Sequence, residues 1–174
     1  MKRALFLAVA AVGLAGIACS QQSPAAETSV TIGGKTISIK YNAPSVKGRK
    51  IFGDGGRISK DGTYPVWRLG ADSATRFHTD VNLDLGGLKV PAGDYTLYAQ
   101  VDAQPWQLIV SKQTGQWGTV YVKENDLGRV KMTMSKPASL VETMKITLSK
   151  TDEKSGKLVV EWEHSSAAVN FKVQ

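Results

Sequence analysis

Four cationic or aromatic side chains have the chemistry of a ligand-binding site: Arg49, Trp67, Arg68 and Trp117. An arginine guanidinium offers a planar fork of donors to a carboxylate, a phosphate or sugar hydroxyls, and a tryptophan ring offers a flat face for stacking. If the long loop around them folds against the turn at 115–118, they line one pocket or groove. The alternative is structural, with Trp67 closing one end of the fold and Arg68 paired with Asp72.

Acid–base chemistry has two weaker candidates. His78 and Asp80 are two positions apart, which places both on one face of a strand, and a His–Asp pair is half of an acid–base device. Glu161 and Glu163 also share a strand face, but glycosidase carboxylates usually come from different strands. Both pairs are also ordinary surface residues of strands, and the chain has no G-x-S-x-G motif. We therefore assign no catalytic residue.

Metal and cofactor chemistry has little support in the composition. One Cys and two His exclude a cysteine-rich zinc site, a CxxC redox motif and an intramolecular disulfide. Asp54, Asp61 and Asp72 lie in a loop region but lack the regular spacing of a calcium loop. We expect no metal site and no cofactor.

The N-terminus has the pattern of an export signal. Lys2 and Arg3 precede an apolar stretch over 4–18, which is too short to span a bilayer but suits a signal-peptide core. Gly16-Ile17-Ala18-Cys19 resembles the motif at which bacterial lipoproteins are cleaved and lipidated at the Cys. We expect a signal peptide over 1–18, a lipidated Cys19 with a polar tether over 19–27, and one domain over 28–174. The alternative is cleavage after Ala25 or Ala26, without lipid.

The charge of the chain fits an envelope protein. The formal net charge is +7, and removal of 1–18 leaves 20 basic and 15 acidic residues, a net charge of +5. The densest basic group is Lys47, Arg49, Lys50 and Arg57. Because an exported protein rarely meets nucleic acid, we expect none as a partner. Attraction to anionic envelope surfaces, or solubility, is the better explanation of the charge.

Alternating apolar residues predict an all-β protein from residue 28 onward. Val30-Thr31-Ile32 and Ile37-Ser38-Ile39 flank Gly33-Gly34, a strong hairpin signal. Further strands are expected at 95–101, 106–110, 119–122, 130–134, 144–148, 158–162 and 169–173. About ten strands with one apolar face each predict an antiparallel β-sandwich, jelly-roll-like or an irregular barrel.

The segment 42–70 interrupts this alternation. It contains six glycines and two prolines, which predicts one long functional or mobile loop.

The same region carries a family resemblance. The stretches are Tyr41 to Gly53, Val66-Trp67-Arg68-Leu69-Gly70-Ala71, Val90-Pro91-Ala92-Gly93-Asp94-Tyr95-Thr96-Leu97, Trp106 to Lys112, Gly115-Gln116-Trp117-Gly118 and Leu158 to Glu163. Together they resemble the bacterial domain of unknown function 2911 family over about residues 30–174. The resemblance implies an exported or lipid-anchored bacterial protein of β-rich fold, and it implies no activity.

The leading hypothesis is a non-enzymatic, lipid-anchored protein on the membrane of the bacterial cell envelope. It binds a ligand or partner through the 42–72 loop face, and a glycan or an envelope protein fits equally well. One rival is a hydrolase of envelope glycans or esters that uses carboxylates and His78. The other is a structural role in envelope assembly.

Overall fold

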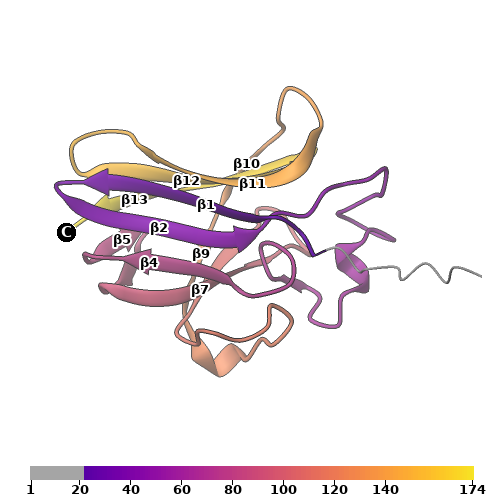
Figure 1. Cartoon of the computed structure of the whole chain (residues 1–174), viewed down its shortest axis with the longest axis horizontal. Coiled ribbons are helices and arrows are strands. Elements are labelled where there is room, and N and C mark those ends of the chain that lie inside the picture. The colour runs from indigo at the N-terminus through magenta and orange to yellow at the C-terminus, as the bar shows by residue number, and fades with distance from the viewer. Residues whose placement is uncertain (1–21) are drawn as a thin grey trace, which may run out of the picture.

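Two antiparallel sheets packed face to face form the protein in the computed structural model, which describes residues 22–174 (Figure 1). One sheet has the order β1-β2-β4-β7-β8-β9, with β3 paired to β7, and the other has the order β11-β12-β13-β5-β6, with β10 paired to β13. The strands are β1 (Ala25–Ile32), β2 (Lys35–Asn42), β3 (Val66–Trp67), β4 (Thr75–Thr79), β5 (Leu83–Leu85), β6 (Leu88–Val90), β7 (Gly93–Gln100), β8 (Gln107–Ser111), β9 (Asp126–Lys131), β10 (Thr133–Ser135), β11 (Val141–Lys150), β12 (Ser155–Glu163) and β13 (Ser165–Val173). The predicted all-β sandwich is confirmed.

The expected first hairpin is present. Gly33 and Gly34 have φ angles of 58° and 74°, which a two-residue turn between strands of this twist requires. β1 begins at Ala25, which pairs with Asn42, so the strand starts three residues before the expected domain boundary.

The core lies between the two sheets. Alternate residues of each strand face inward, as Leu158, Val160 and Trp162 do on β12. Along one edge the sheets are linked by side chains, because the backbone N–H of Ile146 donates to the Tyr41 hydroxyl at 2.9 Å and that of Leu148 donates to Thr28 Oγ1 at 3.1 Å.

One expected strand is wrong. Residues 119–122 form no strand but lie as a loop over the outer face of the first sheet, where Tyr121 packs against Tyr98 with ring centroids 5.1 Å apart. Tyr98 holds the loop there by donating from its hydroxyl to the carbonyl of Val120 at 2.8 Å. The apolar run therefore covers outward-facing side chains instead of pairing in a sheet.

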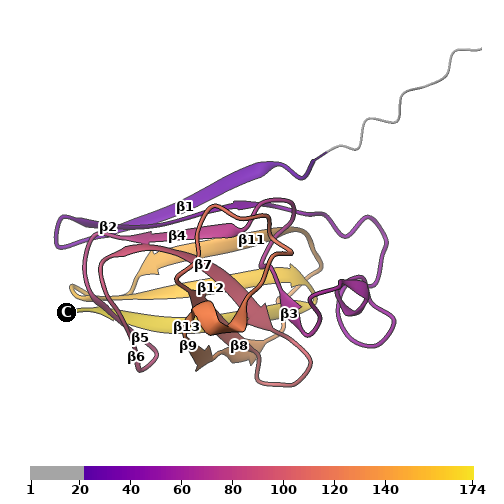
Figure 2. The same cartoon turned by 90° about the horizontal axis from the view of Figure 1, so that it is seen from below.

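The long loop is present between β2 and β3, over 43–65, with a short 3-10 helix, η1 (Ile58–Lys60). It lies at the end of the sandwich where β1 begins, as does β3 (Figures 1 and 2). A second 3-10 helix, η2 (Lys123–Asn125), precedes β9. Within residues 22–174, none of the helices has the length and hydropathy needed to cross a membrane.

Candidate functional site

A polar pocket opens at the loop end of the sandwich. Its volume is about 340 Å³, and Arg49, Arg57, Arg68, Asp61 and Asp72 line it. Further lining residues are Ser23, Pro44, Ile58, Gly70, Ala71 and Trp162. The pocket thus joins the start of the described chain, the 43–65 loop and the segment after β3. We call it the arginine pocket.

Asp61 organises two of the arginines. Its Oδ1 accepts a hydrogen bond from Arg57 Nη1, and its Oδ2 accepts one from Arg68 Nη2 at 3.1 Å. The side chains of Asp61 and Arg68 are only 9% and 13% exposed, so this ion pair is largely removed from water. Arg68 therefore pairs with Asp61, and the pairing with Asp72 that the structural alternative contained is wrong.

Arg49 is held by its own loop. Its Nε donates to the carbonyl of Val46 at 3.0 Å and its Nη2 donates to that of Ser45 at 2.6 Å. These carbonyls fix the orientation of the guanidinium without neutralising it. Among the residues that the structure describes, no carboxylate forms an ion pair with Arg49.

Asp72 fixes the wall where the chain enters the fold. Its Oδ2 accepts the backbone N–H of Ser23 at 3.0 Å, and its carbonyl accepts that of Gly118 at 2.9 Å. The carbonyl of Ser23 in turn accepts from Asn42 Nδ2 at 2.9 Å. The first described residues are therefore attached to the pocket rather than lying apart from it.

Trp67 is not available to a ligand, and the expectation that it offers a stacking face is wrong. It is fully buried, with ring centroids 5.2 Å from Phe52, 6.1 Å from Trp106 and 5.7 Å from Trp162. The alternative, in which Trp67 closes the end of the sandwich, describes its position. The sequence could not separate the two because an aromatic residue in a short strand suits either role.

This aromatic cluster forms the base of the loop end, and Trp162 connects it to the arginine pocket. Trp162 is 3% exposed and is one of the pocket's lining residues. Its Nε1–H and that of Trp67 are buried and have no hydrogen-bond partner among the described residues.

Trp117 is exposed but does not line the arginine pocket. The residue is 48% exposed, and its backbone forms an isolated antiparallel β-bridge with Ser73. The neighbouring Gly118 does pack against the pocket, because a Cβ there would lie 2.6 Å from Arg68 Cδ and 2.7 Å from the carbonyl oxygen of Asp72. The 115–118 turn thus lies against Arg68, as expected, while the indole of Trp117 stays outside the pocket.

His78 lies elsewhere, on the outer face of the first sheet. Its Nε2 is 3.0 Å from Asp80 Oδ1, and its Nδ1 is 2.9 Å from Asp94 Oδ1. The hydrogen bond with Asp80, followed by that with Asp94, raises the pKa of His78 above its usual 6.5. Because both ring nitrogens are engaged and the charged form is favoured, this imidazole is poorly suited to accept a proton from a substrate.

The two glutamates are also engaged. Glu161 forms an ion pair with Lys145 at 3.0 Å, and Glu163 Oε1 accepts the backbone N–H of Ile51 at 3.0 Å. The Glu163 contact ties the end of β12 to the long loop. Glu161 and Glu163 therefore each stabilise a different contact of the fold.

The three loop aspartates do not gather around a common point. Asp61 and Asp72 have the partners given above, and Asp54 is exposed, with its carbonyl accepting from Lys50 Nζ at 2.7 Å. Over residues 22–174, no cluster of three or more His, Cys, Asp or Glu side chains has the arrangement of a metal site.

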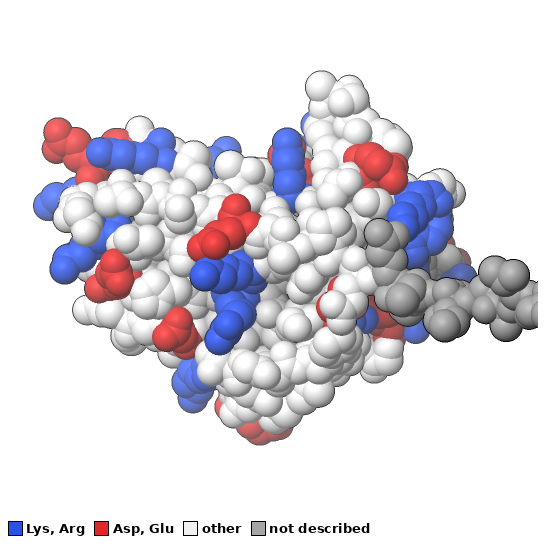
Figure 3. Space-filling model, in the orientation of Figure 1, with Lys and Arg blue, Asp and Glu red and all other residues white. Residues whose placement is uncertain are grey.

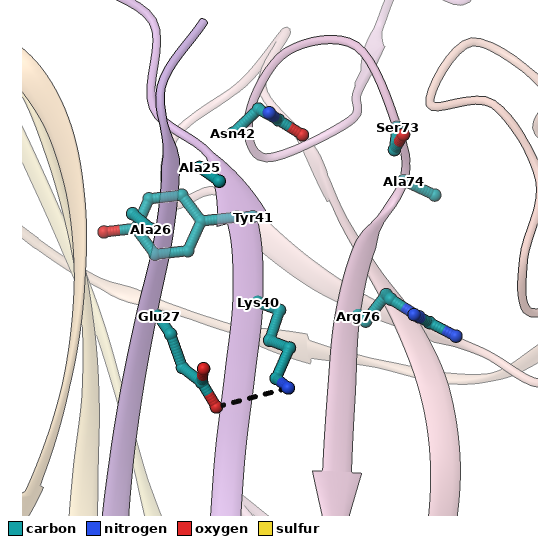
Figure 4. Close-up of a pocket in the computed structure, with 9 residues that line it drawn as sticks. All are labelled: Ala25, Ala26, Glu27, Lys40, Tyr41, Asn42, Ser73, Ala74 and Arg76. Carbon is teal, nitrogen blue, oxygen red and sulfur yellow. Dashed lines mark ion pairs between the residues drawn. The ribbon is translucent and has the colours of Figure 1, made fainter.

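A shallow groove on the outer face of β1, β2 and β4 was not expected from the sequence. Glu27 and Lys40 point toward each other across it, 3.6 Å apart, while Arg76 points away (Figure 4). An adjoining hollow shares these three residues and extends to His78 and Asp94. A strand was assumed around His78, but its neighbours in the sheet were not predicted, so nothing in the sequence indicated that Lys40 and Arg76 lie side by side.

Cys19, the predicted lipidation site, lies outside the described residues.

Comparison with the curated proteins and with the solved structures finds no match to this chain. A family model does match, over residues 23–171, which cover both sheets and the arginine pocket almost completely. The chain belongs to the family of proteins of unknown function DUF2911.

Proposed function

We propose that this chain is a non-enzymatic binding protein of the bacterial cell envelope, anchored by a lipid on Cys19, and that its arginine pocket binds an anionic group. Arg49 carries the proposal. It is an oriented guanidinium at a pocket whose other two arginines already share one carboxylate, and it has no acidic partner of its own in residues 22–174.

The charges of the pocket favour an anion. Three arginines face two aspartates, so the lining carries a net charge of +1. Arg57 and Arg68 are held in place by Asp61, which means that little side-chain entropy remains to be lost when a ligand arrives. A carboxylate or a phosphate matches the donors of a guanidinium, and such charge-assisted bonds are about twice as strong as neutral ones.

The hydrolase hypothesis has less support. His78 has both nitrogens bound to carboxylates, and Glu161 and Glu163 bind Lys145 and the Ile51 amide. Each proposed acid or base therefore already has a structural partner. An assembly role would need a partner surface, and no observation favours it over ligand binding.

The pocket can be tested with simple anions. We expect phosphate and acetate to shift the NMR signals of residues that line the pocket, and Arg49→Gln to weaken that binding about 10- to 100-fold, the size expected for a lost hydrogen bond to a charged group. Arg76→Gln is the matched control, because Arg76 is an exposed arginine of the outer groove. Stability should change by less than about 0.5 kcal/mol in both variants. Equal binding by wild type and Arg49→Gln, or equal loss in both variants, would contradict the proposal.

The anchor has a separate test. Wild-type protein should fractionate with membranes and Cys19→Ser should not, because the proposed lipid is attached to that sulfur. Retention of Cys19→Ser in the membrane fraction would count against lipidation and leave the anion pocket unaffected.

A further inference from the structure

We propose that the loop end of the domain lies against the membrane and that the arginine pocket receives the phosphate of an anionic phospholipid headgroup. This inference rests on the proposed function, because it names the ligand of the same pocket. Three observations carry it: the place where the chain enters the fold, the charge around the pocket and the position of Trp117.

The chain enters the fold on the pocket wall. Ser23 lines the arginine pocket and is fixed to Asp72 and Asn42 by hydrogen bonds of 3.0 and 2.9 Å. Ser23 is four residue steps from Cys19, and a fully extended chain of that length spans at most about 14 Å. A lipid on Cys19 therefore keeps the pocket within about 14 Å of the membrane surface, whatever path the chain takes.

The exposed charges of this end are mainly positive. The exposed basic residues of the loop are Lys47, Arg49, Lys50, Arg57 and Lys60. Lys and Arg side chains are visible at the end of the molecule where this loop lies, and others lie over the opposite end (Figure 3). The acidic side chains beside them are the exposed Asp54 and also Glu142, whose Oε1 accepts the backbone N–H of Lys47 at 2.8 Å. Because Arg57 is paired with Asp61, four of these cations stand against the two carboxylates. The surface is therefore still positive and complements anionic headgroups, each such cation favouring binding about fivefold.

An exposed tryptophan lies at the same end. The turn that carries Trp117 is joined to the pocket wall, since the N–H of Gly118 donates to the Asp72 carbonyl and the N–H of Ala74 donates to the Gln116 carbonyl. Tryptophan side chains favour the headgroup region of a bilayer, where the ring is half in contact with water. A domain docked by its arginine pocket would place Trp117 at that depth.

Trp117 also supplies a built-in reporter. The other three tryptophans are Trp67, Trp106 and Trp162, which are 0%, 4% and 3% exposed, so a quencher in the surrounding medium reaches Trp117 first. The lipidated protein, isolated from membranes of a bacterium that expresses the full chain, is placed in vesicles containing a phospholipid with a spin label on its headgroup. One set of vesicles is phosphatidylcholine alone, and the other contains equal parts of phosphatidylcholine and phosphatidylglycerol.

We expect the label to quench Trp117 more strongly in the phosphatidylglycerol vesicles. Arg49→Gln with Arg57→Gln removes two cations from the pocket and should lower the ratio of docked to undocked domain about 25-fold. Lys157→Gln with Lys172→Gln removes the same charge from exposed positions of β12 and β13 and should leave the quenching unchanged. Soluble glycerol phosphate, added in excess, should compete with the lipid and release Trp117.

Equal quenching in the two sets of vesicles would overturn the proposed orientation. So would equal loss of quenching in the two double variants, because general charge attraction would then explain the effect. If the isolated protein carries no lipid on Cys19, the proposed orientation is overturned as well, because it depends on that anchor. If glycerol phosphate still binds wild type and not Arg49→Gln in any of these cases, the anion pocket stands and only the membrane ligand is wrong. If it binds neither protein, the proposed function fails as well.

Discussion

Truncation of Trp67 tests most directly whether a buried aromatic cluster forms the base of the loop end. From the sequence, Trp67 and Trp117 are equally good candidates for stacking on a ligand, whereas the structure buries Trp67 and exposes 48% of Trp117. Trp67→Ala removes an indole that contacts three aromatic rings, those of Phe52, Trp106 and Trp162. Trp117→Ala removes an indole of the same size from the surface and is the matched control.

The expected magnitude follows from the buried area. A buried tryptophan removes about 150–250 Å² from water, and at about 25 cal/mol per Å² this corresponds to about 4–6 kcal/mol. Measured truncations of buried aromatic side chains cost about 3–5 kcal/mol, because neighbours relax only in part. We therefore expect about 4 kcal/mol for Trp67→Ala, a large part of the total stability of a domain, which is about 5–15 kcal/mol. Trp117→Ala should cost less than about 0.5 kcal/mol.

Urea unfolding followed by circular dichroism measures both variants, with Trp67→Phe as a third. The Nε1–H of Trp67 has no partner among the described residues, so Trp67→Phe removes an unsatisfied donor together with part of the ring. Its cost should therefore fall well below that of Trp67→Ala, near 1 kcal/mol, because relief of the unsatisfied group offsets the lost area. A loss below about 1.5 kcal/mol for Trp67→Ala, which is half the low end of the range for buried aromatics, would refute the packing described here.

Three further changes test other parts of the structure. Gly156→Ala should cost about 1–3 kcal/mol, because its Cβ would clash with the Phe171 ring and lie 2.8 Å from the carbonyl oxygen of Ser149; an unchanged urea midpoint would contradict that close approach. The carboxylate partners of His78 raise its pKa, so its contribution to stability is complete below pH 6.5 and is lost as the pH rises through the folded-state pKa. The difference in unfolding free energy between wild type and His78→Gln should therefore shrink toward alkaline pH, and a difference that grows would show that the sign is wrong. Asp61→Asn should cost about 3 kcal/mol by chemical denaturation, because Arg68 stays largely buried without its carboxylate; a loss below about 1 kcal/mol would mean that the ion pair is not desolvated.

Local patterns predicted the strands whose two faces differ. The hairpin of β1 and β2, and the strands β11, β12 and β13, follow from alternation because one face of each is apolar and the other polar. β7 was predicted from the same alternation, although the structure buries both of its faces. Alternation did not predict β4, although His78 and Asp80 were placed on a strand, because Thr75 and Thr79 are polar residues that the structure buries. β3, β5 and β6 are two or three residues long and too short to show any period.

The candidate site was predicted by residue type rather than by geometry. Arg49 and Arg68 do line one pocket with the long loop, as the sequence suggested. Arg57 and Asp61 complete that pocket but were not predicted as part of it, because the pairing of Asp61 with two arginines depends on the turn formed by η1. The burial of Trp67 depends on rings from three other segments, and no local pattern reports such a cluster.

The course of β1 has a mechanical consequence. The strand runs away from the loop end and pairs with β2 at eight consecutive positions, from Ala25 with Asn42 to Ile32 with Lys35 (Figure 2). A force applied to the domain through its N-terminus acts along this strand, across the direction of its hydrogen bonds. All eight positions then bear the load together in shear, whereas a pull at right angles would open them one after another. The N–H of Ala43 donates to the Pro24 carbonyl at 2.8 Å and adds one more hydrogen bond that bears the same load. β1 is therefore held in the sheet in the geometry that best resists a pull on the N-terminus.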